Sequence, residues 1–115
     1  MANKNPNSID LRKREKSLSM LSNLIRLKIL YLLKNTKEKI SFNQIADKLS
    51  IDKNKLSYHI ALLKNNNFIS NEIRPNKTGR TFSFYHISKK GENAIESIEK
   101  INKDNEDNLN ELENL

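Results

Sequence analysis

Apolar side chains recur at helical spacing in five stretches of the chain and alternate with polar ones in two others. The first helical stretch begins after Ser8 or Asp10, and the others cover residues 24–34, 42–49, 53–65 and the segment from residue 89 onward. The two alternating stretches, residues 69–74 and 81–87, predict the strands of a hairpin. Ile40 is expected to add a short edge strand. The pattern therefore predicts a mainly α fold with a small β-hairpin.

Polar residues suited to helix N-cap positions precede all five of these helices: Ser8 or Asp10, Asn23, Ser41, Asp52 and Ser88. Ser41 with Gln44 also has the S-x-x-Q pattern of a capping box. Only residues 50–52 separate the third helix from the fourth, and two capped helices joined so tightly predict a helix-turn-helix. One of the three asparagines at 65–67 can end the fourth helix, because Asn tolerates left-handed backbone angles.

The second helical stretch is the most apolar and is expected to be the most buried helix; its large side chains are Leu24, Leu27, Ile29, Leu30 and Leu33. In the fourth helix Leu56, Ile60 and Leu63 form a narrow apolar stripe. A second face, with Tyr58 at its margin, is polar and basic and has no acid: Lys53, Asn54, Ser57, Ala61 and Lys64. Such a helix can enter a DNA major groove, although an ordinary solvated face has the same pattern. His59 lies between the two faces, where it either makes a structural hydrogen bond or contacts a base.

The segment that joins the two strands is rich in turn residues and basic. Arg74, Lys77 and Arg80 surround it, with no acid at the tip. A hairpin of this kind, placed after a helix-turn-helix, can lie along the DNA backbone or minor groove. It can equally be a plain surface hairpin. In its second strand Tyr85 and Ile87 share one face, and the opposite face holds Phe82, Phe84 and His86.

The first and last helices are thinly apolar. The first carries Leu11, Leu18 and Leu21, with a basic cluster at residues 12–16 that either touches DNA phosphates or is solvated. The last carries a stripe of Ala94, Ile95, Ile98 and Ile101, followed by an imperfect heptad pattern with Asn102, Asn105, Leu109 and Leu112. Helices of this kind need a surface to pack on. The last helix either pairs with a second subunit or packs on its own domain and ends near residue 103.

Charge is unevenly distributed along the 115 residues. Residues 1–90 hold 19 Lys and Arg against 6 Asp and Glu, whereas residues 91–115 hold 2 against 8. A basic body favours a polyanionic partner. No cysteine is present, which excludes disulfides and thiolate metal sites and suits a cytoplasmic protein. The two isolated histidines, the scarce glycine and the lack of an 18-residue apolar run predict no metal, no cofactor, no enzymatic activity and no membrane association.

The motif LSYHI at residues 56–60, followed by Leu63 and by Phe68–Ile69, resembles the recognition segment of the ArsR-like winged-helix regulators. That family's segment reads roughly V-S-x-H-L, then Leu, then a Gly-Leu-Val ending. Asn67 stands where the family usually has glycine. Residues 21–30 are similar to the family's opening motif, except that Leu24 replaces a proline.

Residues 85–91 resemble the end of the family's wing, so that the resemblance covers about residues 17–95. It implies a winged helix-turn-helix, and a homodimer that binds DNA and is often released by a metal or a redox change. The Cys-containing sensing motif of the family is absent from residues 42–49. We therefore expect no metal sensing by that route.

These observations predict a sequence-specific double-stranded DNA-binding transcriptional regulator, a repressor, with helix 53–65 in the major groove and wing 70–87 on the backbone or minor groove. The predicted DNA-binding residues are Lys53, Asn54, Lys55, Ser57, Tyr58, Lys64, Lys77 and Arg80. The alternative is a winged-helix module that binds protein in a transcription complex. Residues 1–7 are expected to be a flexible N-terminus, 8–103 the domain with flanking dimerisation helices, and 104–115 an acidic helix extension or tail.

Overall fold

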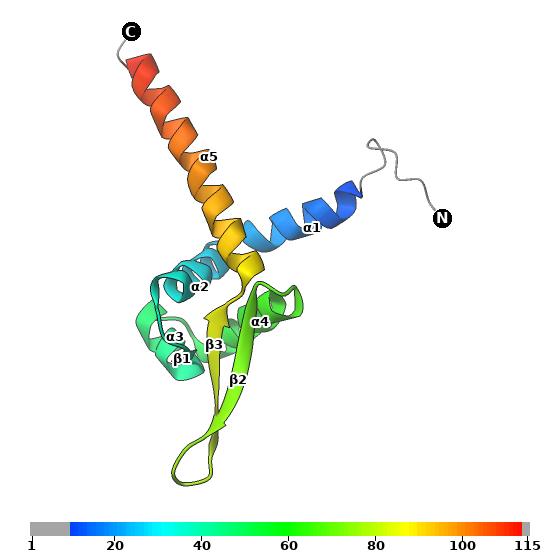
Figure 1. Cartoon of the computed structure of the whole chain (residues 1–115), viewed down its shortest axis with the longest axis vertical. Helices are drawn as coiled ribbons and strands as arrows, with labels where there is room; N and C mark the ends of the chain where they lie inside the picture. The colour runs from blue at the N-terminus through cyan, green and yellow to red at the C-terminus, as the bar shows by residue number, and fades with distance from the viewer. Residues whose placement is uncertain (1–9, 114–115) are drawn as a thin grey trace.

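A computed structural model describes the backbone of residues 10–113 and the side chains of residues 10–104 (Figure 1). Its elements in chain order are α1 (Leu11–Leu21), α2 (Leu24–Asn35), β1 (Ile40–Ser41), α3 (Phe42–Leu49), α4 (Lys53–Asn65), β2 (Ile69–Pro75), β3 (Thr81–Ile87) and α5 (Lys89–Glu113). The predicted mainly α fold with a small hairpin is confirmed, as are the bounds of the third and fourth helices. The expected flexible segment 1–7 lies outside the described residues.

Local capping explains why these helices begin where they do. The Asn23 side chain accepts a hydrogen bond from the Arg26 amide at 3.1 Å, and Ser41 and Gln44 make both bonds of the predicted capping box. The Asp52 carboxylate accepts from two amides in the first turn of α4. Ser88 Oγ accepts from the Gly91 amide at 3.1 Å, so this predicted cap is also present. Each such cap stabilises its helix by about 1 kcal/mol.

The three strands form one antiparallel sheet in the order β1-β3-β2. Ile40 pairs with Tyr85, which confirms the expected edge strand, and the hairpin register runs from Ile69 opposite Ile87 to Pro75 opposite Thr81. Asn67 ends the preceding turn with a φ of 66°, the left-handed conformation expected within the asparagine run. The sheet therefore follows α4 after one tight turn, and the far half of the hairpin projects beyond the helices (Figure 1).

The core lies where α2, α3, α4 and the base of the sheet meet. Its largest fully buried side chains are Ile29, Leu30, Ile45, Leu56, Leu63, Phe68 and Ile95. Helix α2 supplies much of this core, as expected, although Leu24, one of the large apolar side chains of this helix, is 67% exposed. Leu24 occupies the first position of α2, one turn before the side chains that reach α3 and α4. Arg26, a charged residue, is buried instead.

Helices α1 and α5 diverge from this core (Figure 1). No residue of α1 is buried, and Leu11, Leu18 and Ile101 are each more than half exposed. The Tyr31 hydroxyl donates to Glu99 at 2.5 Å and fixes the course of α5 against α2. This bond to a carboxylate raises the pKa of Tyr31 to about 12, so the hydroxyl stays a donor at neutral pH.

Helix α5 continues to Glu113 and does not end near residue 103, the bound that went with one of the two alternatives for this helix. The carboxyl-terminal heptad positions Asn105, Leu109 and Leu112 have side chains outside the described set. Within the part of the chain that the structure describes, no helix is both long and apolar enough to cross a membrane.

Candidate nucleic-acid interface

Helix α4 is anchored along one side and open along the other. Leu56, Ile60 and Leu63 are buried as predicted, together with His59. The face expected to meet DNA is exposed throughout: Lys53, Asn54, Ser57, Tyr58, Ala61 and Lys64. Lys55 is exposed as well. No other described part of the chain covers this face, which leaves its hydrogen-bonding groups accessible to an external partner.

The turn before α4 fixes the angle at which the helix is presented. Ser50 ends α3 in the left-handed conformation, with a φ of 52°, and the Ile51 amide donates to the Ala46 carbonyl at 3.1 Å. Ile51 packs against the core from within this turn. Asp52 then caps α4. The chain therefore changes direction within residues 50–52, which is the arrangement expected of a helix-turn-helix.

A buried hydrogen-bond network holds α4 from behind. The Arg26 guanidinium bonds the Met20 carbonyl at 2.6 Å, the Ser19 carbonyl at 3.3 Å and His59 Nδ1 at 3.1 Å. Burial, and then the charges of Arg26 and Lys55, lower the pKa of His59. His59 thus makes the structural hydrogen bond that is one of its two expected roles, on the side of α4 opposite its exposed face.

Tyr58 stands at the margin of the exposed face and is 62% exposed. Its ring meets the His59 ring edge to face, with centroids 5.1 Å apart and an interplanar angle of 75°. Because His59 is itself held by Arg26, this contact limits the orientations that Tyr58 can adopt. An exposed aromatic side chain on a fixed support is suited to contact a partner's surface.

The hairpin tip is an ordered turn built around Asn76. The Asn76 side-chain oxygen accepts from the Thr78 amide at 2.9 Å and from the Arg80 amide at 3.0 Å, and the Asn76 backbone amide donates to the Arg80 carbonyl at 2.7 Å. Gly79 adopts a φ of 84°, which favours glycine. The turn exposes both Lys77 and Arg80.

Arg74 differs from the other two basic residues of the hairpin. Its guanidinium lies 3.1 Å from Glu72 and 5.7 Å from the centre of the Phe84 ring. Glu72 also pairs with Lys39, and these two bonds, that from Lys39 first, lower the pKa of Glu72 to about 2. The expectation of an acid-free tip therefore applies to Lys77 and Arg80 but not to the stem, where Glu72 offsets the charge of Arg74.

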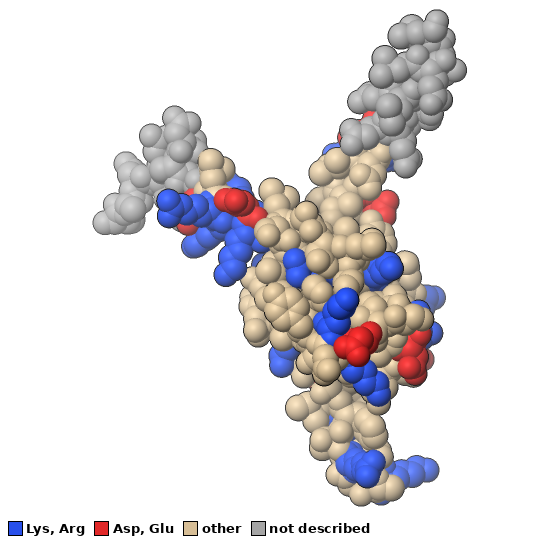
Figure 2. All heavy atoms as spheres, turned by 180° about the vertical axis from the view of Figure 1, so that it is seen from behind, with Lys and Arg blue, Asp and Glu red and all other residues tan. Residues whose placement is uncertain are grey.

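The eight predicted residues form two separate groups. Six lie on α4 and two, Lys77 and Arg80, lie at the hairpin tip, where Figure 2 shows blue side chains at one end of the molecule. Sequence reasoning missed Arg26, which supports the first group from the core. Its one sequence signal is a lone arginine among the aliphatic positions of α2.

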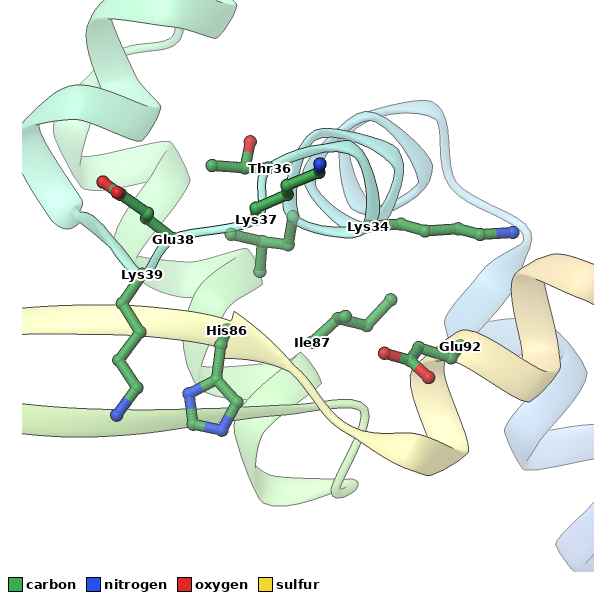
Figure 3. A pocket seen from close by; sticks show the side chains of 9 residues that line it. Lys34, Thr36, Lys37, Glu38, Lys39, His86, Ile87 and Glu92 are labelled. Carbon is green, nitrogen blue, oxygen red and sulfur yellow. The ribbon is translucent and has the colours of Figure 1, made fainter.

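An open cavity of about 370 Å³ lies between the end of α2, the following loop, β3 and the start of α5 (Figure 3). Leu33 and Ile87 contribute apolar surface, and His86 and Glu92 supply polar groups. None of the eight predicted DNA-binding residues lines it. The described residues contain no group of three or more His, Cys, Asp or Glu side chains that could hold a metal ion.

A helix-turn-helix followed by a hairpin and backed by a three-helix core defines the winged-helix class of domains. Residues 25–103 match the family described as the winged helix DNA-binding domain, and the chain belongs to this family. The match includes α4 and the whole hairpin. No protein of curated function matches the chain in sequence.

Solved structures with the same fold include several transcriptional regulators. The reduced form of YodB from B. subtilis is 16% identical, with a TM-score of 0.67 and coverage of 88% of this chain and 90% of that one. A PadR-like transcription factor from Bacteroides fragilis is 24% identical, with a TM-score of 0.65 and coverage of 90% and 99%. NolR from Sinorhizobium fredii is 23% identical, with a TM-score of 0.66 and coverage of 88% and 96%. At these identities the likeness shows the fold.

Proposed function

We propose that this winged-helix protein is a transcriptional regulator, a repressor, that binds a specific double-stranded DNA sequence. One observation carries the proposal: α4 is fixed on its inner side and presents an exposed, acid-free polar face on its outer side. A helix of this width fits the major groove, where base edges offer a distinct donor and acceptor pattern for each base pair. The solved neighbours that are transcriptional regulators support the same class of function.

The exposed side chains of α4 have chemistry suited to different DNA groups. Asn54 can pair with adenine, and Lys53 with guanine or a phosphate. Ser57 can bond either a base or a phosphate, and Tyr58 can contact a phosphate or a thymine methyl group. Lys55 and Lys64 are assigned to phosphates, because each lies at an edge of the exposed face.

The hairpin is proposed to act as a wing on the DNA backbone or minor groove. Lys77 and Arg80 are exposed on a turn whose backbone is fixed by Asn76. Phosphate contacts of this kind position a domain on the duplex without reading sequence. The assignment to the DNA backbone is better supported for Arg80 than for Lys77. The Arg80 backbone is hydrogen-bonded to Asn76, while the Arg80 side chain is exposed.

Dimerisation through α1 and α5 is part of this proposal. Leu11, Leu18 and Ile101 are exposed on helices that diverge from the core, and exposed apolar side chains on a projecting helix favour a partner helix. In this division residues 8–103 form the DNA-binding domain with its dimerisation helices, and residues 104–115 extend α5. Two copies should then present their α4 helices about 34 Å apart, one turn of DNA, and bind an inverted repeat.

Within the winged-helix family we assign the chain to the ArsR-like regulators. The LSYHI motif supports this assignment, since its His59 is buried and its Ser57 is exposed on the same helix. The cytoplasmic location expected from the cysteine-free sequence also stays part of the proposal.

Selection of bound duplexes from a random-sequence library tests the proposed function. We expect one enriched sequence with inverted-repeat symmetry. If each copy neutralises about five phosphates, the logarithm of the affinity of the dimer should fall with the logarithm of salt concentration at a slope near −9. A library without enrichment, together with a flat salt response, would instead favour the protein-binding module, in which the same basic face contacts an acidic protein.

A further inference from the structure

Helix α1 has two chemically distinct sides. With about 100° between successive residues, Arg12, Lys13 and Lys16 fall within one arc, and Leu11 and Leu18 lie on the opposite side. All five side chains are exposed. The three basic residues are called the α1 basic stripe below.

No ion pair among the described residues involves this stripe, although the acids Asp10 and Glu15 lie near it in the chain. The ion pairs among the described residues are Lys39–Glu72 and Arg74–Glu72, both far from α1 in the chain. In Figure 2 the blue side chains of α1 gather along the edge of the helix that faces the hairpin end of the molecule, whereas α5 leaves in the other direction. The stripe therefore shares a side of the molecule with the basic hairpin tip.

Helix α1 is also fixed in position relative to α4. The last turn of α1 is joined to α4 through Arg26, which bonds the Ser19 and Met20 carbonyls and His59. Asn66 Nδ2, just past α4, lies 3.4 Å from the Met20 sulfur. These contacts hold the end of α1 against the inner side of α4, so the position of α1 relative to the exposed face of α4 is fixed.

We propose that the α1 basic stripe binds the phosphate backbone of the DNA beyond the base pairs that α4 contacts. The inference rests on the proposed function and adds a third contact to it. A duplex has the matching charge, with one negative charge for about each 1.7 Å of its axis. The acidic α5 of a second copy is the competing partner for these cations. It is disfavoured because a helix that covers Leu11 and Leu18 leaves the stripe facing away from it.

Binding to two duplexes distinguishes the DNA backbone from the α5 of a second copy as the partner of the stripe. One duplex is the minimal sequence obtained by selection. The other is the same sequence with about 10 bp of arbitrary flank, one helical turn, on each side. The test variant of the full chain combines Arg12→Gln, Lys13→Gln and Lys16→Gln. A matched control combines Lys28→Gln, Lys34→Gln and Lys37→Gln, which removes the same charge from exposed positions outside α1, α4 and α5. A third variant, Arg12→Lys, Lys13→Arg and Lys16→Arg, keeps the charge.

On the extended duplex the test variant should lose affinity at least tenfold at low salt. Its salt slope should become less negative by up to about 2.7 per chain, which is 0.9 for each of three phosphates. On the minimal duplex it should match the native chain, and its base preference should not change. The charge-keeping variant and the matched control should behave as the native chain on both duplexes.

The proposal is overturned if the test variant binds the extended duplex as tightly as the native chain, or if the matched control loses as much. It is also overturned if the test variant loses affinity equally on both duplexes while sedimentation equilibrium shows weaker pairing, since the stripe would then bind a second copy. These results differ from failure of the proposed function, in which the native chain itself shows no preferred sequence.

Discussion

The buried guanidinium of Arg26 donates a hydrogen bond from Nη1 to Nδ1 of His59 across 3.1 Å, which ties α2 to the inner side of α4. Arginine carries no acceptor, so His59 must accept at Nδ1 and carry its proton on Nε2. The same guanidinium bonds two carbonyls at the end of α1. One side chain therefore joins the proposed dimerisation helix to the proposed recognition helix.

Replacing Arg26 with Met should lower the free energy of unfolding by about 2–4 kcal/mol. Methionine fills similar space, but it leaves the buried His59 Nδ1 and the partly buried Met20 carbonyl without this donor, and each such group costs about 1–3 kcal/mol. The Ser19 carbonyl keeps its bond from the Ser22 amide. Urea denaturation followed by circular dichroism measures the change. Lys28→Met, at an exposed position of the same helix, should change stability by less than about 0.5 kcal/mol. Equal effects of the two substitutions would contradict the network.

Stability should depend on pH through His59. Its folded-state pKa is lowered from the ordinary value of 6.5, so below about pH 6.5 the unfolded chain takes up a proton that the native chain does not. The stabilisation is complete above that pH and decreases as the pH falls toward the folded-state pKa, by at most about 1.4 kcal/mol per pH unit. Urea titrations between about pH 5 and 7.5 measure this slope.

His59→Asn should remove that slope, because the amide oxygen can accept from Arg26 without titrating. His86→Asn, which removes the other imidazole of the chain, is the matched control and should keep it. The pH range of the urea titrations stops at about pH 5. At lower pH Glu72, whose pKa is lowered from 4.5 to about 2, adds its own loss of stability. A His59→Asn variant with the native slope would mean that another group is responsible.

Much of the fold could be predicted because its signals are local. The capping box at Ser41 and the N-cap at Asp52 depend on residues within one helical turn, and both helices begin where these signals place them. The same holds for the hairpin, whose strands alternate and whose turn contains Gly79. The exposed face of α4 also follows from helical periodicity, since Leu56 and Leu63 fix which side is buried.

The remainder depends on interactions between distant residues. Arg26 can be buried because its guanidinium bonds His59. This partner lies 33 positions away in the chain. Arg74 forms an ion pair with Glu72, and Glu72 forms a second one with Lys39 in the loop before β1. The sheet topology brings Lys39 to Glu72. Periodicity along one helix or strand cannot show the partners His59 and Lys39. Glu72 is only two positions from Arg74 on the same strand, so this one pairing follows from the alternation of side chains.

Gly91→Ala should destabilise the protein although Gly91 lies within α5, where alanine is the better helix former by about 1 kcal/mol. A Cβ at this position would lie 2.3 Å from the Phe68 carbonyl oxygen and 2.7 Å from an Ile87 side-chain carbon. The backbone atom cannot move without breaking the start of β2, so the clash outweighs the helix propensity. We expect a loss of about 1–3 kcal/mol in urea denaturation. Asn93→Ala, exposed in the same helix, should be neutral or stabilising.

Asn54→Ala and Tyr58→Ala should relax base preference more than they reduce overall affinity. Each side chain is exposed on α4 and is assigned to a base edge or to a group beside it, and a good base contact contributes about 1–3 kcal/mol of discrimination. Competition binding between the selected sequence and single-base variants measures this. Asn35→Ala, at the exposed end of α2, is the control and should leave the preference unchanged. Unaltered discrimination in both α4 variants would remove their assignment to the groove.

Arg80→Ala should weaken binding to all DNA sequences alike and make the salt slope less negative by about 1 for each phosphate that is no longer neutralised. The side chain is exposed, whereas the turn depends on the Arg80 backbone, which bonds Asn76, so the variant keeps the shape of the tip. Salt titrations of the selected and an unrelated duplex measure both effects. Arg74→Ala removes the same charge from the same hairpin, but Glu72 already engages that guanidinium, so its effect on the slope should be smaller. An Arg80 variant with native affinity, or an Arg74 variant with the larger reduction in affinity, would refute the assignment of the wing tip to the backbone.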